Sequence, residues 1–211
     1  MERSEISKEQ MTNLLKSILP IVLSQGPSHT SMDRVASSLG ISKRTLYEIF
    51  GSKDAMLSEV LEYQYTESHR KAEEIFRTTD NMMEAMVKLM LNYQDVLEIT
   101  SPVFFRDMDE RFKHLRPAYD SKMDKRNSHL SQVIGKGIEQ GMFREDCDLE
   151  MSLRLMRVQL ESIKRMEDYF PPEITIVQAF YAIVQGFLRS IATRKGIEQL
   201  DYLTNNQIIK K

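Results

Sequence analysis

Apolar residues recur three and four positions apart through almost the whole chain, and this spacing is the strongest constraint on its fold. It places apolar side chains on one face of each helix. Strand signals are scarce, since the sequence has 8 glycines, 6 prolines and no Asn-Gly or Asp-Gly pair. At 211 residues, the chain can bury a core without a disulfide or metal. We therefore predict an all-α fold.

Glycine, proline and capping residues divide this pattern into separate helices. We expect helices at about 7–25, 32–39, 43–50, 53–77, 81–100, 117–140, 149–169 and 172–195, with a short one around 104–112. Pro20 removes a backbone hydrogen bond within the first helix, so it should kink that helix or end it early. We expect the tail after Gly196 to be loosely packed.

Composition excludes several classes of protein. A net charge of −2 excludes a strongly basic nucleic-acid coat but leaves room for a small basic patch. The single cysteine, Cys147, cannot form an internal disulfide and fits a reducing cytosol. The first ten residues are charged, and the apolar stretch at 18–23 is too short to span a membrane. We expect a soluble, cytoplasmic protein.

Residues 30–57 carry the most informative pattern in the chain. Two short helices are joined by a tight turn in which Gly40 supplies the positive φ. Val35 on the first helix and Leu46 and Phe50 on the second are expected to face inward. This arrangement is typical of a helix-turn-helix, a motif that places its second helix in the DNA major groove.

The second of these helices has suitable chemistry for reading DNA. Ser42, Lys43, Arg44 and Thr45 lie at its N-terminus, where free N–H groups and the helix dipole favour phosphate. Lys43 and Arg44 are long enough to reach guanine O6 and N7. Residues 41–53 hold three cations and one anion, a local net charge of +2.

Residues 30–57 resemble the DNA-binding domain of the TetR (tetracycline-repressor-like) family of one-component transcriptional regulators. Their sequence is TSMDRVASSLGISKRTLYEIFGSKDAML. The likeness lies in the first helix, the turn and recognition helix LGISKRTLYEIF, and the SKDAML that opens the next helix. It implies a helix-turn-helix DNA-binding domain at 1–52 and a C-terminal regulatory and dimerisation helical domain at 53–211.

The resemblance implies phosphate contacts from Thr45, Tyr47 and Lys53, and base reading by Lys43 and Arg44. The full set of predicted DNA-binding residues is Thr30, Ser31, Ser42, Lys43, Arg44, Thr45, Tyr47, Glu48 and Lys53.

Two positions depart from the family's pattern, because Glu48 and Ile49 stand where aromatic residues or histidine often contact DNA. Glu48 either accepts a hydrogen bond from cytosine N4 or repels phosphate. Ile49 either packs inside the domain or meets a thymine methyl group.

Ten of the 14 methionines lie between Met82 and Met166. Methionine adapts to irregular cavities, so this region either lines a small-molecule pocket or simply fills a core. By resemblance, a ligand would lie among the middle helices. The candidate pocket residues are Met86, Met90, Tyr93, Phe105, Met108, Tyr119, Met123 and Gln159.

The last two predicted helices each have two apolar faces. Both faces can be buried in one subunit, or one can pack against a partner, which is the interpretation we favour. The predicted dimer interface consists of Leu149, Leu153, Met156, Leu160, Ile163, Ile176, Ala179, Phe180, Ala182, Ile183, Gly186 and Phe187. A second stripe on the first of these helices contains Met151, Leu155, Val158 and Met166.

Catalysis has little support in the sequence. The four histidines are scattered, without metal-ligand spacing. Cys147 lies in the acidic stretch Glu145-Asp146-Cys147-Asp148, where neighbouring anions disfavour a thiolate. We expect no catalytic residues, no metal and no cofactor.

The sequence thus predicts a homodimeric repressor that a small-molecule ligand releases from a palindromic double-stranded DNA operator. Two alternatives remain. One is a DNA-bound scaffold or architectural regulator that responds to a protein partner. The other is a helical adaptor that does not bind DNA.

Overall fold

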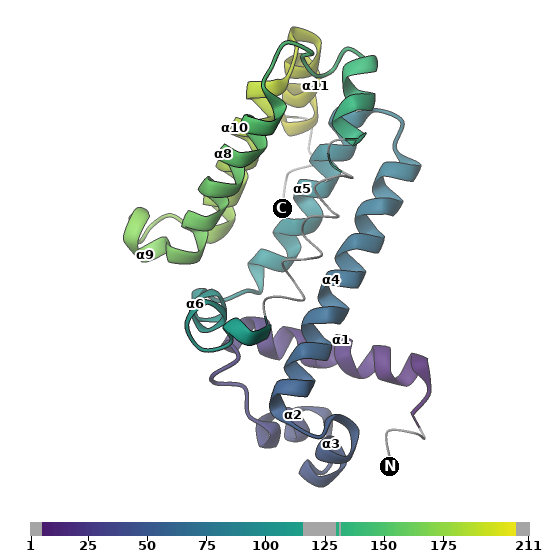
Figure 1. The fold of residues 1–211 in the computed structure, drawn as a ribbon, viewed down its shortest axis with the longest axis vertical. Helices are drawn as coiled ribbons and strands as arrows, with labels where there is room; N and C mark the ends of the chain where they lie inside the picture. The colour runs from purple at the N-terminus through teal and green to yellow at the C-terminus, as the bar shows by residue number, and fades with distance from the viewer. Residues whose placement is uncertain (1–5, 116–129, 131, 206–211) are drawn as a thin grey trace. The chain divides into compact units, whose positions relative to one another are not determined.

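The computed structural model describes residues 6–115, 130 and 132–205, and it confirms the all-α prediction there (Figure 1). The described part of the chain contains the α-helices α1 Lys8–Gln25, α2 Met32–Leu39, α3 Lys43–Phe50, α4 Lys53–Thr78, α5 Met82–Glu98, α6 Pro102–Glu110, α8 Leu149–Ser162, α9 Met166–Tyr169, α10 Ile176–Ile191 and α11 Arg194–Asn205. Two 3₁₀ turns are η2 Lys113–Leu115 and η3 Ile163–Arg165. Residues 132–139 are also helical. No helix in the described ranges is long and apolar enough to cross a membrane.

The chain forms two compact units. The first unit contains Met1–His69 and Ile99–Lys122, and the second contains Arg70–Glu98 and Met123–Lys211. Each unit has its own cluster of buried apolar side chains. This division follows packing and does not test where a DNA-binding domain ends, so the boundary after residue 52 stays a prediction.

In the first unit, α1 continues through Pro20 to Gln25, so of the two expected effects of Pro20, a kink or an early end, the early end is wrong. Ser7 is the N-cap of the helix, and its side chain and that of Gln10 form a capping box. Its inner face buries Ile18 and Val22 completely. Burial of this face stabilises the helix enough to offset the one hydrogen bond that proline removes.

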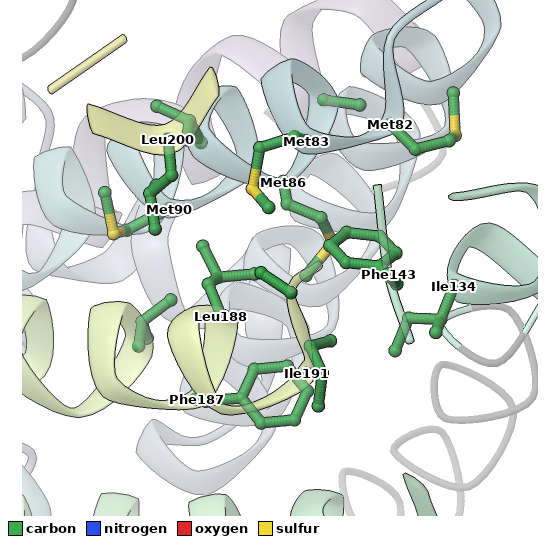
Figure 2. Close-up of a cluster of buried hydrophobic side chains, with 14 of the residues drawn as sticks. Met82, Met83, Met86, Met90, Ile134, Phe143, Phe187, Leu188, Ile191 and Leu200 are labelled. Carbon is green, nitrogen blue, oxygen red and sulfur yellow. The ribbon is translucent and has the colours of Figure 1, made fainter. Parts of the chain in front are cut away.

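The core of the second unit lies between α5, α10 and α11. Figure 2 shows the methionines of α5 over Leu188 and Ile191 of α10, with Ile134 and Phe143 to one side. Met83 and Leu188 have no exposed surface. Much of the methionine-rich region therefore fills a core.

The C-terminal helices differ from the prediction. The expected helix at 149–169 is divided into α8, η3 and α9, and the expected helix at 172–195 extends only from Ile176 to Ile191. It stops because Ala192 is extended and pairs with Phe143 in an isolated β-bridge, in which Arg144 N–H donates to the Ile191 carbonyl at 2.7 Å.

Residues 197–205 are not loosely packed, contrary to the prediction, and the rest of the tail lies outside the described residues. Residues 197–205 belong to α11, in which Leu200 and Leu203 are buried. Gly196 lies so close to the turn that contains Met142 that a Cβ added to Gly196 would be 2.1 Å from the Met142 carbonyl oxygen. The hydroxyl of Thr193 accepts a hydrogen bond from the Gly196 N–H at 3.0 Å and so stabilises the start of the helix.

Two glycines in the helical residues 132–139 provide a matched test of this packing. A Cβ at Gly137 would lie 2.2 Å from the ring of Phe143, whereas a Cβ at Gly135 would meet nothing within 4 Å. We expect Gly137→Ala to lower the free energy of unfolding by about 1–3 kcal/mol through overpacking. Gly135→Ala should raise it by up to about 1 kcal/mol, because alanine favours helix. Urea denaturation of both variants measures the difference, and equal effects would contradict the packing around Phe143.

Candidate nucleic-acid interface

The turn between α2 and α3 has the geometry that the sequence predicts. Gly40 has φ +66° and ψ +25°, in the left-handed region. Its N–H donates to the Ser37 carbonyl at 3.2 Å, and the Ile41 N–H donates to the Ala36 carbonyl at 3.1 Å. This pair of hydrogen bonds is a Schellman motif, which ends α2 and turns the chain into α3.

Both helices of the motif begin with a serine cap. The Ser31 hydroxyl accepts from the Arg34 N–H at 3.2 Å, and the Ser42 hydroxyl accepts from the Thr45 N–H at 3.0 Å. Ser42 also lies 2.8 Å from the hydroxyl of Thr45. The two caps leave serine side chains exposed at the N-termini of α2 and α3, where an anion is favoured.

Burial of one face of α3 decides which of its side chains face solvent. Leu46, Ile49 and Phe50 are buried, with at most 4% of their surface exposed. Ile49 therefore packs inside, which settles the alternative that the sequence left open. Lys43 and Arg44 are exposed on the remaining surface.

The two exposed cations of α3 each have a carboxylate partner. Lys43 Nζ lies 2.8 Å from Asp33 of α2, and Arg44 Nε lies 2.8 Å from Glu48 one turn along α3. The hydrogen bond that Lys43 donates to Asp33 raises the pKa of Lys43, and the hydrogen bond that Arg44 donates to Glu48 lowers the pKa of Glu48. The same face also carries Tyr47, which is 43% exposed.

Thr30 and Lys53 are predicted DNA contacts whose side chains are wholly or partly buried. Thr30 is completely buried, and its hydroxyl donates to the Gly26 carbonyl at 2.9 Å. Lys53 is half-buried at the first position of α4, and this burial lowers its pKa. Its Nζ donates to the Ser28 carbonyl at 3.4 Å and lies 5.7 Å from the centre of the Phe112 ring.

The surroundings of Lys53 include residues that the sequence pattern did not identify. Ser28 lies between α1 and α2, and Asp107 lies on α6, 79 positions later. Asp107 accepts two hydrogen bonds from Ser28, each 2.7 Å long. No spacing or motif relates these two positions, so only the fold brings them together.

The candidate ligand residues of the second unit differ in their burial. Met86 and Met90 are buried in the core, and Tyr93 is half-buried with its ring 6.5 Å from that of Phe180. Gln159 is exposed on α8.

The other candidate ligand residues belong to different parts of the chain. Phe105 and Met108 are on α6 in the first unit, where the ring of Phe105 lies 5.5 Å from that of Phe104. Tyr119 and Met123 lie outside the described residues.

Most of the predicted dimer residues face the core of their own chain. Buried there or packed against it are Leu149, Leu153, Met156, Leu160, Ile163, Ile176, Ala179, Phe180, Ile183 and Phe187. Ala182 and Gly186 instead lie on the exposed side of α10. On α8 the second stripe is the exposed one, with Met151, Leu155 and Val158 at 51%, 57% and 68% exposure.

Comparison with known proteins finds regulators that are similar to this chain. The sequence model described as "Bacterial regulatory proteins, tetR family" matches residues 22–60. The HTH-type transcriptional repressor KstR2 of Mycobacterium tuberculosis is 26% identical over 150 residues, which cover 68% of this chain and 74% of that protein.

Two solved structures share the fold. The ketosteroid transcriptional regulator KstR2 of Mycobacterium tuberculosis has a TM-score of 0.59 at 20% identity, covering 90% of this chain and 98% of that one. A putative transcriptional regulator from Saccharomonospora viridis in complex with choline has a TM-score of 0.67 at 17% identity, covering 89% and 100%. The matched segment and the repressor relative thus make this chain similar to bacterial regulatory proteins of the TetR family, and the solved structures share its helical fold.

Proposed function

We propose that the protein is a homodimeric transcriptional repressor that binds a palindromic operator. The observation that carries this proposal is the outer face of α3, where Lys43, Arg44 and Tyr47 surround the capped N-terminal turn of a helix whose inner face is buried. The HTH-type repressor relative supports the same role. Because bacterial DNA lies in the cytoplasm, we propose that the protein is cytoplasmic. We also propose that it binds DNA without catalysing a reaction.

The carboxylate partners of Lys43 and Arg44 are compatible with this role. Both ion pairs are exposed, and exposed pairs in water hold their partners weakly. DNA phosphates and guanine edges compete well for such cations, because binding also releases counterions from the DNA. Glu48 lies on the same exposed surface of α3, where we propose that it accepts a hydrogen bond from cytosine N4.

We also propose that a small molecule releases the repressor from DNA. The Saccharomonospora viridis regulator, which shares the fold, was solved in complex with choline, and this supports the binding of a small molecule by this chain as well. Release requires that the ligand bind more tightly to the conformation that cannot hold the operator, because equal affinity for both conformations shifts nothing. The domain division at 52/53 is part of this proposal.

The surface that we propose for dimerisation is the exposed side of α8 and α10. Met151, Leu155 and Val158 form an apolar stripe on α8, and α10, which packs against α8, exposes the small residues Ala182 and Gly186. Small side chains allow close approach of a partner helix. A two-fold dimer places two copies of α3 one DNA turn apart, roughly 34–36 Å, which fits a palindrome.

Arg44 is the first test of base reading. Arg44→Ala should lower affinity for an operator selected from random DNA by about ten- to hundred-fold and relax the preference at one base position. A binding titration against single-base variants of the operator measures both effects. Unchanged affinity and preference would show that α3 does not read bases through Arg44.

Lys53 tests the phosphate contact separately from base reading. Lys53→Ala should weaken binding to all sequences similarly, and the slope of log affinity against log salt should become shallower by about one. The measurement is a salt series on operator and on unrelated DNA. A loss confined to the operator would contradict a phosphate role.

The dimer face is tested by two neighbouring substitutions on α8. Val158→Glu places a carboxylate in the apolar stripe and should shift the protein from dimer to monomer. Arg157→Glu changes the net charge more than Val158→Glu does, but residue 157 lies about 100° around the helix axis from residue 158. The dimer should therefore persist in Arg157→Glu. Sedimentation velocity distinguishes the two species, and a dimeric Val158→Glu protein would exclude this face.

A further inference from the structure

A buried carboxylate on α6 has no part in the function proposed above. Asp107 is 5% exposed and is the sole charged residue that is buried among the residues the structure describes. Burying a carboxylate is costly unless hydrogen bonds or charges compensate it. Its surroundings therefore indicate what keeps it there.

The partner of Asp107 is the loop that leads into α2. The Ser28 N–H donates to Oδ2 and the Ser28 hydroxyl donates to Oδ1, each at 2.7 Å. Gly26 makes room for this contact, because a Cβ there would lie 2.8 Å from Oδ2 and 2.9 Å from Val103 Cγ1. Its φ of +79° also favours glycine. The loop is thus shaped around the carboxylate.

Ser28 connects this carboxylate to Lys53. The Ser28 carbonyl accepts from Lys53 Nζ at 3.4 Å, and the ring of Phe112 lies beneath the same ammonium group. Asp107 also attracts the charge of Lys53 directly. Arg111 donates to the Ser28 hydroxyl at 3.4 Å. One serine therefore joins α6 to the N-terminal end of α4.

We propose that Asp107 is a positioning residue for DNA binding, which acts through Ser28 to fix the loop ahead of α2 and the ammonium group of Lys53. This inference rests on the proposed DNA-binding function. An ammonium group has three N–H donors, so Lys53 can donate to Ser28 and to a phosphate together. Fixing a flexible side chain before binding reduces the entropy that is lost when the phosphate contact forms.

The same contact fixes the start of α2. Ser31, three positions after Ser28, caps that helix. The Thr30 hydroxyl donates to the carbonyl of Gly26, which precedes Ser28 by two positions. Holding Ser28 by both its N–H and its hydroxyl therefore restrains the loop at its centre. Loss of the carboxylate loosens two predicted DNA contacts, Ser31 and Lys53, without removing either.

The test is a double-mutant cycle on operator affinity, with salt dependence as the second readout. Asp107→Asn keeps the shape of the side chain but removes its charge and one acceptor, and it should lower affinity about ten-fold. Lys53→Gln should lower affinity and make the salt slope shallower by about one. In the Asp107→Asn protein, Lys53→Gln should cost several-fold less, because the lysine has already lost its fixed position. Glu110→Gln removes an exposed charge from the same helix and should leave affinity unchanged.

Three other outcomes would each contradict a specific part of the proposal. If Asp107→Asn lowers only the melting temperature, with affinity and salt slope of the folded protein unchanged, the residue is merely structural and the proposal is wrong. Strictly multiplicative effects in the cycle would show that Asp107 does not act through Lys53. If the wild-type protein binds no DNA at all, the proposed function itself fails.

Ser28→Ala covers the case in which Asp107→Asn does not fold. It removes one of the two donors to Asp107 and retains the N–H, the carbonyl and the carboxylate. We expect a few-fold loss of operator affinity and a reduced effect of Lys53→Gln. Wild-type affinity and an undiminished effect of Lys53→Gln in Ser28→Ala would overturn the proposal.

Discussion

Burial of the inner face of α3 is the interaction on which the proposed DNA-reading surface depends. Leu46, Ile49 and Phe50 pack with apolar residues of α1, α2 and α4, and this fixes the rotation of the helix about its axis. A different rotation would bury Lys43 or Arg44 and expose apolar side chains. The chemistry of the surface is therefore set by packing on the opposite side of the same short helix.

Local features of this region were predictable because each depends on residues close in sequence. The left-handed turn at Gly40 and the caps at Ser31 and Ser42 follow from neighbours within four positions. The contact between Asp107 and Ser28 was not predictable, since 79 positions separate the two residues and no motif links them. The end of α10 depends in the same way on a pairing with Phe143.

Amphipathic helices with two apolar faces show a second limit of sequence reasoning. Periodicity predicts that both faces of α8 are apolar, but it does not say which one the chain's own core takes. In the structure, Leu153 of α8 and Ile163, which directly follows α8, are buried in that core, whereas Leu155 and Val158 are exposed. The proposed dimer surface consequently moves to the opposite face of the helix, while the reasons for expecting a dimer are unchanged.

The central claim is that a two-fold dimer reads DNA sequence through α3, and selection of bound fragments from random DNA tests it most directly. The account predicts one enriched palindrome with half-sites about one helical turn apart. Its affinity should fall steeply with salt, as several phosphate contacts require. Fragments without a common sequence, bound no more tightly than random DNA at every salt concentration, would contradict the account.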